Sequence, residues 1–131
     1  MSEQERRVSR ILLAEDEEAL RAFVARALTQ DGHEVVATAD GGEALEVLVR
    51  EQGRFDLLLT DIRMPVMDGI ALALAAARDY PELVILLMTG YADQRERAHG
   101  LDALIHDVIA KPFSLADIRK AVQEALIAKG R

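Results

Sequence analysis

The chain has no cysteine and no tryptophan among its 131 residues, and it has only three prolines. Without cysteine it can form neither disulfides nor thiolate metal sites. No segment approaches the roughly 18 uninterrupted apolar residues of a membrane span, and residues 1–9 lack the apolar stretch of a secretory signal. The sequence therefore predicts a cytoplasmic protein that does not contact a membrane.

Basic residues are also scarce, since 16 lysines and arginines stand against 23 aspartates and glutamates, for a net charge of −7. No stretch combines clustered basic residues with aromatic ones, as nucleic-acid-binding surfaces do. We therefore expect protein partners and no nucleic acid. The length is that of one domain with a real hydrophobic core.

Short apolar runs alternate with helical patterns along the chain. The apolar runs predict five strands, at residues 10–14, 34–37, 55–60, 83–88 and 107–110. Helical patterns lie between and after them, around residues 20–28, 40–50, 68–79, 93–102 and from residue 114 onward. This alternation predicts an α/β fold with a parallel sheet covered on both faces by right-handed crossovers.

The helical spacing also predicts which apolar side chains face the sheet. They are Leu20, Phe23, Val24, Ala27, Leu28, Leu45, Leu48, Val49, Leu115, Ile118, Val122 and Leu126. The helix around residues 70–77 (IALALAAA) is apolar on all sides, so either Leu72 or Leu74 should lie near solvent.

Two helix starts carry the spacing of a capping box, Asp40 with Glu43 and Ser114 with Asp117. No histidine has the spacing of a metal ligand, so surface positions are expected for His33, His99 and His106.

Polar residues follow four of the predicted strands. Glu15 and Asp16 come after the first, Asp61 after the third, Thr89 after the fourth and Lys111 after the fifth. In a parallel sheet these carboxyl ends meet at one edge, where ligand sites form. Three carboxylates suit a cation, and a hydroxyl with an ammonium suits an anion. Together they predict a site for Mg²⁺ and a phosphoryl group.

The segments around these residues resemble the receiver domain of bacterial response regulators: residues 11–18 (ILLAEDEE), 61–69 (DIRMPVMDG), 88–92 (MTGYA) and 111–113 (KPF). The resemblance covers nearly the whole chain. It implies a flavodoxin-like, doubly wound (βα)5 domain of the CheY-like superfamily, with strand order 2-1-3-4-5. Residues 1–8 would be a mobile tail and residues 9–129 the receiver domain.

The resemblance also implies roles for single residues. Asp61 would accept the phosphoryl group as an aspartyl phosphate and would bind Mg²⁺ as well. Asp16 would be a direct Mg²⁺ ligand, Glu15 would hold a metal-bound water or a second position, and the backbone carbonyl of Arg63 would add an oxygen. Lys111 would pair with Asp61 before phosphorylation and with the phosphoryl group afterwards.

Further roles come from the same resemblance. Thr89 would be the switch hydroxyl that moves to hydrogen-bond a phosphoryl oxygen, and the peptide bond before Pro112 would be cis. The side chains of Arg63 and Tyr91 would modulate the rate, with Tyr91 screening the phosphoryl group from water.

The chain departs from the receiver pattern at two places. Receivers commonly have Tyr or Phe three residues before the lysine, where this chain has Val108, so the usual aromatic toggle is absent. Gly100 interrupts the expected fourth helix, and residues 103–106 (ALIH) replace a common Gly-Ala pair. Switching would therefore depend on Thr89 and the segment that follows it.

The implied function is that of a stand-alone receiver, which is not an enzyme beyond assisting its own phosphorylation and dephosphorylation. It would take a phosphoryl group from a histidine kinase or a histidine phosphotransfer protein and switch its binding to a downstream protein. The segments LLAEDEE, DIRMPVMDGIALA, LLMTGYA and ALIHDVIAKPF look similar to the CpdR type of alphaproteobacteria, which are adaptors for the ClpXP protease. A phosphorelay shuttle would carry the same site.

Two other classes share parts of this pattern. A flavodoxin-type FMN carrier has the same topology, but it needs a hydroxyl- and glycine-rich loop where this chain has residues 15–18 (EDEE). A haloacid-dehalogenase-type phosphatase also uses an aspartate nucleophile, but in a D-x-D pattern after the first strand, and that pattern is absent here.

Overall fold

The computed structural model describes residues 9–90, 98 and 100–129. Its centre is a parallel five-stranded sheet in the order β2-β1-β3-β4-β5. The strands are β1 (Arg10–Ala14), β2 (Glu34–Thr38), β3 (Leu57–Asp61), β4 (Val84–Thr89) and β5 (Asp107–Ala110). The predicted α/β class and the strand order 2-1-3-4-5 are confirmed.

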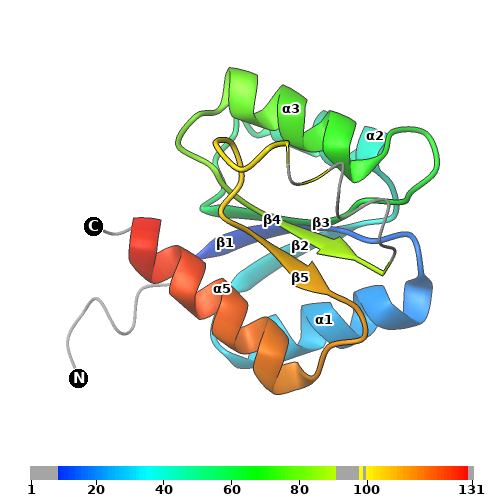
Figure 1. Ribbon diagram of the computed structural model, residues 1–131, viewed down its shortest axis with the longest axis vertical. Helices are drawn as coiled ribbons and strands as arrows, with labels where there is room; N and C mark the ends of the chain where they lie inside the picture. Colours follow the sequence, from blue (N-terminus) through cyan, green and yellow to red (C-terminus); the bar gives the residue numbers. More distant parts are fainter. Residues whose placement is uncertain (1–8, 91–97, 99, 130–131) are drawn as a thin grey trace.

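Helices cover both faces of the sheet (Figure 1). One face carries α2 (Gly41–Arg50) and α3 (Gly69–Asp79), and the other carries α1 (Glu18–Gln30) and α5 (Leu115–Lys129). In the part of the chain that the structure describes, no helix combines the length and the apolarity that a membrane span requires.

The middle strands are buried on both faces, as their continuous apolar runs predict. Leu12 of β1 pairs in register with Leu58 of β3, and both pack in the layer with α2 and α3. The next pair, Leu13 and Leu59, packs in the layer with α1 and α5. The sheet therefore divides the core into two layers.

Strands β3 and β4 each extend one residue further than predicted, to Asp61 and Thr89. Asp61 is in register with Met88, and Thr89 is in register with Ala110. These two polar residues are thus the last residues of their strands, so the ladder fixes their backbones.

The start of β3 differs from the prediction, because the strand begins at Leu57 rather than at residue 55. The Phe55 amide donates instead to the Gly53 carbonyl in a turn, at 2.7 Å. The Phe55 ring is still buried, and the guanidinium carbon of Arg10 lies 4.5 Å from its centre. Phe55 therefore belongs to the core without belonging to the sheet.

Three side chains predicted to face the core are exposed: Phe23 at 42%, Val49 at 60% and Leu115 at 37%. Phe23 and Val49 each lie one residue from a fully buried neighbour, Val24 and Leu48. One residue is about 100° of helical rotation, enough to turn a side chain off the buried stripe. Apolar spacing alone made the predicted stripe too wide.

Helix α3 buries Leu72 completely and leaves Leu74 45% exposed, so the prediction that one of them lies near solvent is confirmed. The predicted helix at residues 93–102 lies mostly outside the described residues. Residues 100–104 form turns, so that helix does not extend to residue 102.

In both predicted capping boxes, the side chain of the cap residue accepts a hydrogen bond from a backbone amide of the first helical turn. Asp40 Oδ1 accepts from the Glu43 amide at 2.8 Å, and Ser114 Oγ accepts from the Asp117 amide at 3.0 Å. In the reciprocal bond of the Asp40 box, Glu43 Oε2 accepts from the Ala39 amide at 3.4 Å. In the second box the Ser114 amide donates to Asp117 Oδ2 at 3.0 Å.

The expectation that all three histidines lie at the surface is wrong for His33. This side chain is half-buried between α1 and β2, and among the described residues its Nδ1 has no hydrogen-bond partner. Burial lowers the pKa of the His33 imidazole below its usual value. His106 is exposed, and His99 lies outside the described residues.

Candidate functional site

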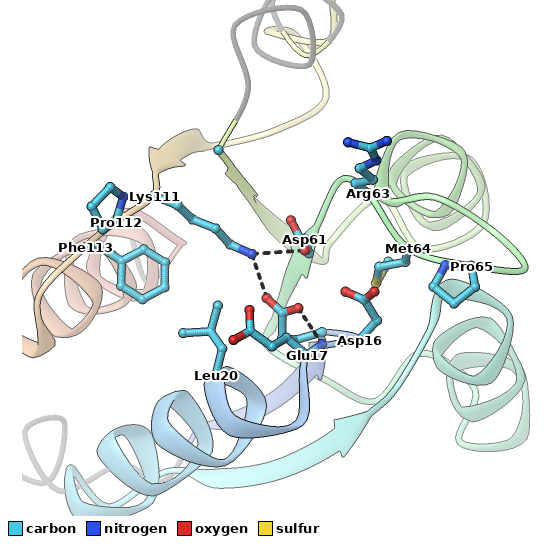
Figure 2. A pocket seen from close by; sticks show the side chains of 12 residues that line it. Asp16, Glu17, Leu20, Asp61, Arg63, Met64, Pro65, Lys111, Pro112 and Phe113 are labelled. Atoms are coloured by element: carbon cyan, nitrogen blue, oxygen red, sulfur yellow. Dashed lines mark hydrogen bonds and ion pairs between the residues drawn. The ribbon is translucent and has the colours of Figure 1, made fainter.

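A cavity of about 850 Å³ opens at the carboxyl ends of β1, β3, β4 and β5 (Figure 2). Its lining combines charged and apolar side chains: Glu15, Asp16, Glu17, Leu20, Asp61, Arg63, Met64, Pro65, Gly90, Lys111, Pro112 and Phe113. In Figure 2 the carboxylates stand in the middle, Phe113 and Leu20 lie to one side, and Met64 and Pro65 lie to the other.

Lys111 joins two buried carboxylates. Its Nζ lies 3.0 Å from Asp61 Oδ2 and 2.9 Å from Glu15 Oε1, and Glu15 is fully buried. Burial of the ammonium lowers the pKa of Lys111, but its hydrogen bonds to Glu15 and Asp61 outweigh that effect and raise the pKa above its usual value. The lysine therefore stays charged across the physiological pH range.

Asp61 is held at both of its carboxylate oxygens. Oδ1 accepts from the amide of Ile62 at 2.9 Å, while Oδ2 accepts from Lys111. The chain after it is closed by the Gly69 amide, which donates to the Ile62 carbonyl at 2.7 Å. A side chain on Gly69 would overlap the Asp61 carbonyl, so only glycine permits this closure.

The donor set of the site fits a divalent cation. Glu15, Asp16 and Asp61 each offer a carboxylate oxygen, and these atoms lie within 4.8 Å of one another. Partial desolvation at the cavity rim and the neighbouring Glu15 carboxylate raise the pKa of Asp16. Three carboxylates against the one ammonium of Lys111 leave excess negative charge, which a hard cation with oxygen ligands would neutralise.

Asp16 and Glu15 differ in how free they are to bind such a cation. Glu15 is buried, with Oε1 on Lys111 and Oε2 accepting from the Glu17 amide at 3.0 Å. Asp16 is exposed at the rim of the cavity. The geometry therefore favours Asp16 as the more accessible oxygen donor.

The structure places Thr89, Arg63 and Pro112 at the same edge. Thr89 is buried at the end of β4, and its carbonyl accepts from the Lys111 amide at 2.7 Å. The Lys111–Pro112 peptide bond is cis. Arg63 is exposed, and Figure 2 shows its side chain directed away from the carboxylates. Tyr91 lies outside the described residues.

The sequence did not reveal the ion pair between Lys111 and Glu15. Only Asp61 was expected to pair with the lysine, whereas the structure gives it two carboxylate partners. A signal existed, because Glu15 directly follows a strand that is buried on both faces. A buried carboxylate requires a cationic or hydrogen-bonding partner.

Val108, which stands where receivers commonly have an aromatic residue, lies beside Leu87 in the β4–β5 register. It is partly buried and packs against the core layer of α2 and α3. The position is therefore occupied by a short aliphatic side chain that has no polar tip.

Comparisons with known proteins agree with this geometry. The family described as the response regulator receiver domain matches residues 11–123. The chain is 40% identical over 121 residues to the response regulator receiver protein CpdR of Brucella abortus (strain 2308). The aligned region covers 92% of this chain and 99% of that protein. It spans half the length or less of seven other curated relatives, one of which is a sensor kinase.

Solved structures show the same fold. A CheY-like receiver domain protein from Methanospirillum hungatei JF-1 superposes with a TM-score of 0.86 at 30% identity, covering 95% of this chain and 98% of that one. The response regulator TrrA of Thermotoga maritima, solved in complex with Mg²⁺ and beryllofluoride, gives a TM-score of 0.80 at 25% identity and covers 90% and 99%.

Proposed function

The chain belongs to the response regulator receiver domain family, and on that premise we propose that Asp61 accepts a phosphoryl group from a phosphohistidine donor. The observation that carries the proposal is the contact of Asp61 with Lys111 beside two further carboxylates. A receiver domain implies a histidine kinase or a histidine phosphotransfer protein as its partner. The FMN-carrier and phosphatase interpretations do not belong to this family, and we set them aside.

Phosphoryl transfer to Asp61 needs little covalent chemistry from the protein. One oxygen of the Asp61 carboxylate attacks phosphorus, the bond from phosphorus to the donor imidazole breaks, and that nitrogen takes up a proton. Lys111 stays charged throughout and stabilises the negative charge near Asp61 Oδ2. Figure 2 shows the Lys111 ammonium directed at this carboxylate.

We propose Mg²⁺ as the cofactor, since the three carboxylates fit a hard divalent cation. Asp16 and Asp61 would bind it directly, Glu15 would hold one of its waters, and the Arg63 carbonyl would add an oxygen. When bound, the ion neutralises charge on the phosphoryl oxygens. The TrrA structure with Mg²⁺ and beryllofluoride supports this assignment for a related protein.

Phosphorylation would then rearrange the contacts of Lys111 and Thr89. It replaces a monoanionic carboxylate with a roughly dianionic group, so Lys111 would turn from the carboxylate to the phosphoryl oxygens. Thr89, buried at the end of β4, would supply a hydroxyl to the same group. Coupling of about 1–3 kcal/mol between such a site and a binding surface is usual.

For the output we propose a protein contact controlled by phosphorylation, as an adaptor that presents substrates to the ClpXP protease. The support is the match to CpdR, which covers almost the whole of both chains. A pull-down with purified ClpX, comparing the protein with and without beryllofluoride, tests it. State-dependent capture is expected, and equal or absent capture in both states would contradict the adaptor role.

Intact-mass measurement tests the phosphorylation itself. Incubation with acetyl phosphate and Mg²⁺ should add one phosphoryl group, and a chelator should prevent the addition. Asp61→Asn should abolish it, whereas Asp68→Asn on the same loop should not, because asparagine also caps helices. Full phosphorylation of Asp61→Asn would refute the assignment.

A further inference from the structure

The loop that follows Asp61 contains a strained turn beside the cavity. In residues 62–68 the Met67 amide donates to the Pro65 carbonyl at 2.8 Å, which closes a three-residue γ-turn around Val66. Val66 has a φ of 70°. Turns of this kind are rare and strained, and a β-branched residue in this region is an outlier.

The hydrophobic core does not hold Val66 in this conformation, because its side chain is 85% exposed. Strained residues persist where surrounding structure over-determines them, and they cluster at functional sites. The contacts that hold the γ-turn must therefore come from another element at the surface and not from the core.

The start of helix α2 is that neighbour. A β-carbon on Gly41 would overlap the backbone carbonyl of Met67, and one on Gly42 would lie 2.7 Å from Val66 Cγ1. The first turn of α2 thus approaches the γ-turn at two consecutive residues, and it does so because neither has a side chain.

The same loop carries residues of the cavity wall. Arg63, Met64 and Pro65 line the cavity next to the carboxylates (Figure 2). The loop is anchored at its base by the bond from Gly69 to the Ile62 carbonyl, and at its tip by contact with α2. A shift of the tip would therefore move the backbone of Arg63, which lies between the two anchors.

We infer that Gly41 and Gly42, the glycine pair, are positioning residues for the phosphorylation site. They hold the γ-turn around Val66 against the start of α2 and thereby fix the loop whose Arg63 carbonyl would face the cation. The part of this inference that concerns the cation rests on the proposed function, and the part that concerns the loop does not. A change at the start of α2 would therefore alter the phosphorylation of Asp61 through this loop.

The stability of Gly41→Ala distinguishes this positioning role from a role confined to helix α2. Alanine favours helix over glycine, so Gly41→Ala would raise the thermal stability if α2 were the only element affected. With the Met67 carbonyl in the way, the same change should displace the loop and lower the stability.

The test uses Gly41→Ala, Gly42→Ala, Val66→Gly and the double variant Gly42→Ala/Val66→Gly. Amide NMR shifts of residues 62–68 report the loop without metal, and an Mg²⁺ titration reports the site. Gly41→Ala should shift these amides and weaken Mg²⁺ binding about fivefold, a coupling of the size that residues without contact to a ligand can exert. Val66→Gly should reverse the smaller effect of Gly42→Ala, because it removes Cγ1. It should not reverse that of Gly41→Ala, which meets a backbone atom.

Gly32→Ala is the matched control. Gly32 has a φ of 94° with nothing within 4 Å of an added β-carbon, so alanine should lower stability there without altering residues 62–68 or Mg²⁺ binding. Unchanged loop amides in Gly41→Ala, or no rescue of Gly42→Ala by Val66→Gly, would overturn the inference. If the unaltered protein binds no Mg²⁺, the proposed cofactor fails, and the loop amides still decide the role of the glycine pair. If Gly41→Ala does not fold, the Gly42 and Val66 variants decide it.

Discussion

Asp16 and Glu17 are adjacent acidic residues at the cavity, and we expect them to have different roles. Asp16 lies with Glu15 and Asp61 in the carboxylate cluster, whereas Glu17 precedes α1 as its N-terminal cap residue. Asp16→Asn should weaken Mg²⁺ binding about tenfold or more, since even a group that only supports a metal ligand typically has that effect. Glu17→Gln should change it little. An amide NMR titration with Mg²⁺ measures both, and equal losses would contradict the proposed ligand set.

His33 should make stability depend on pH. Burial lowers its pKa below the usual 6.5, so the folded protein binds this proton less readily than the unfolded chain does. Above about pH 6.5 the imidazole is neutral in both states and stability is at its full value, and stability is lost as the pH falls from about 6.5 through the lower folded pKa.

Denaturant unfolding between pH 7.5 and pH 5 checks this prediction for His33. His33→Gln should flatten the pH dependence, while the exposed His106→Gln should leave it as in the unaltered protein. The same pH dependence in His33→Gln would show that another group is responsible.

The sequence predicted the chemistry of single residues better than their contacts. Asp61, Thr89 and Lys111 were expected at one edge because each follows an apolar run, and the structure places them there. The second partner of Lys111, Glu15, was not predicted. Side-chain pairing depends on distances across the sheet between residues 96 positions apart, which no local pattern encodes.

Helix α3 offers a direct test of which side of an apolar helix is buried. Leu72 is fully buried and Leu74 is 45% exposed, although both are leucines in the same run. Leu72→Ala should lower the free energy of unfolding by about 2–5 kcal/mol, and Leu74→Ala should stay within about 0.5 kcal/mol of the unaltered protein. Urea unfolding measures both, and similar losses would contradict the described packing.

Local sequence patterns predicted which helices and strands exist, but they did not predict all of the residues at which these begin and end. The predicted helix starts at residues 40 and 68 are the N-caps of α2 and α3, Asp40 and Asp68, because capping is a property of neighbouring residues. The exposure of Val49 could not be predicted. The width of the buried stripe depends on how closely a helix approaches the sheet, and the spacing of apolar residues within the helix does not encode that distance.

The parallel sheet with helices on both faces followed from the alternation of strands and helices, since right-handed crossovers leave few arrangements for such a sheet. The order 2-1-3-4-5 itself came from the resemblance to receivers, because alternation alone does not choose between orders. Neither the alternation nor the resemblance predicted the γ-turn at Val66. A β-branched residue gives no signal for a positive φ.

Switching is the prediction that involves the whole molecule. With Val108 in place of an aromatic toggle, the response to the phosphoryl group should depend on Thr89 and Lys111. Hydrogen exchange with and without beryllofluoride should change mainly in β4, β5 and residues 100–113. Thr89→Ala should still accept a phosphoryl group but should lose most of this change. A change that persists in Thr89→Ala, or that lies mainly in α1, would contradict the account.

The central claim is that Asp61 alone carries the phosphoryl group, and chemical trapping tests it most directly. Borohydride reduces an aspartyl phosphate to homoserine, so the modified residue can be located by peptide mass spectrometry after treatment with acetyl phosphate and Mg²⁺. The account predicts homoserine at position 61 and unmodified aspartate at positions 16, 56 and 68. Homoserine at any of those positions, or none at position 61, would contradict it.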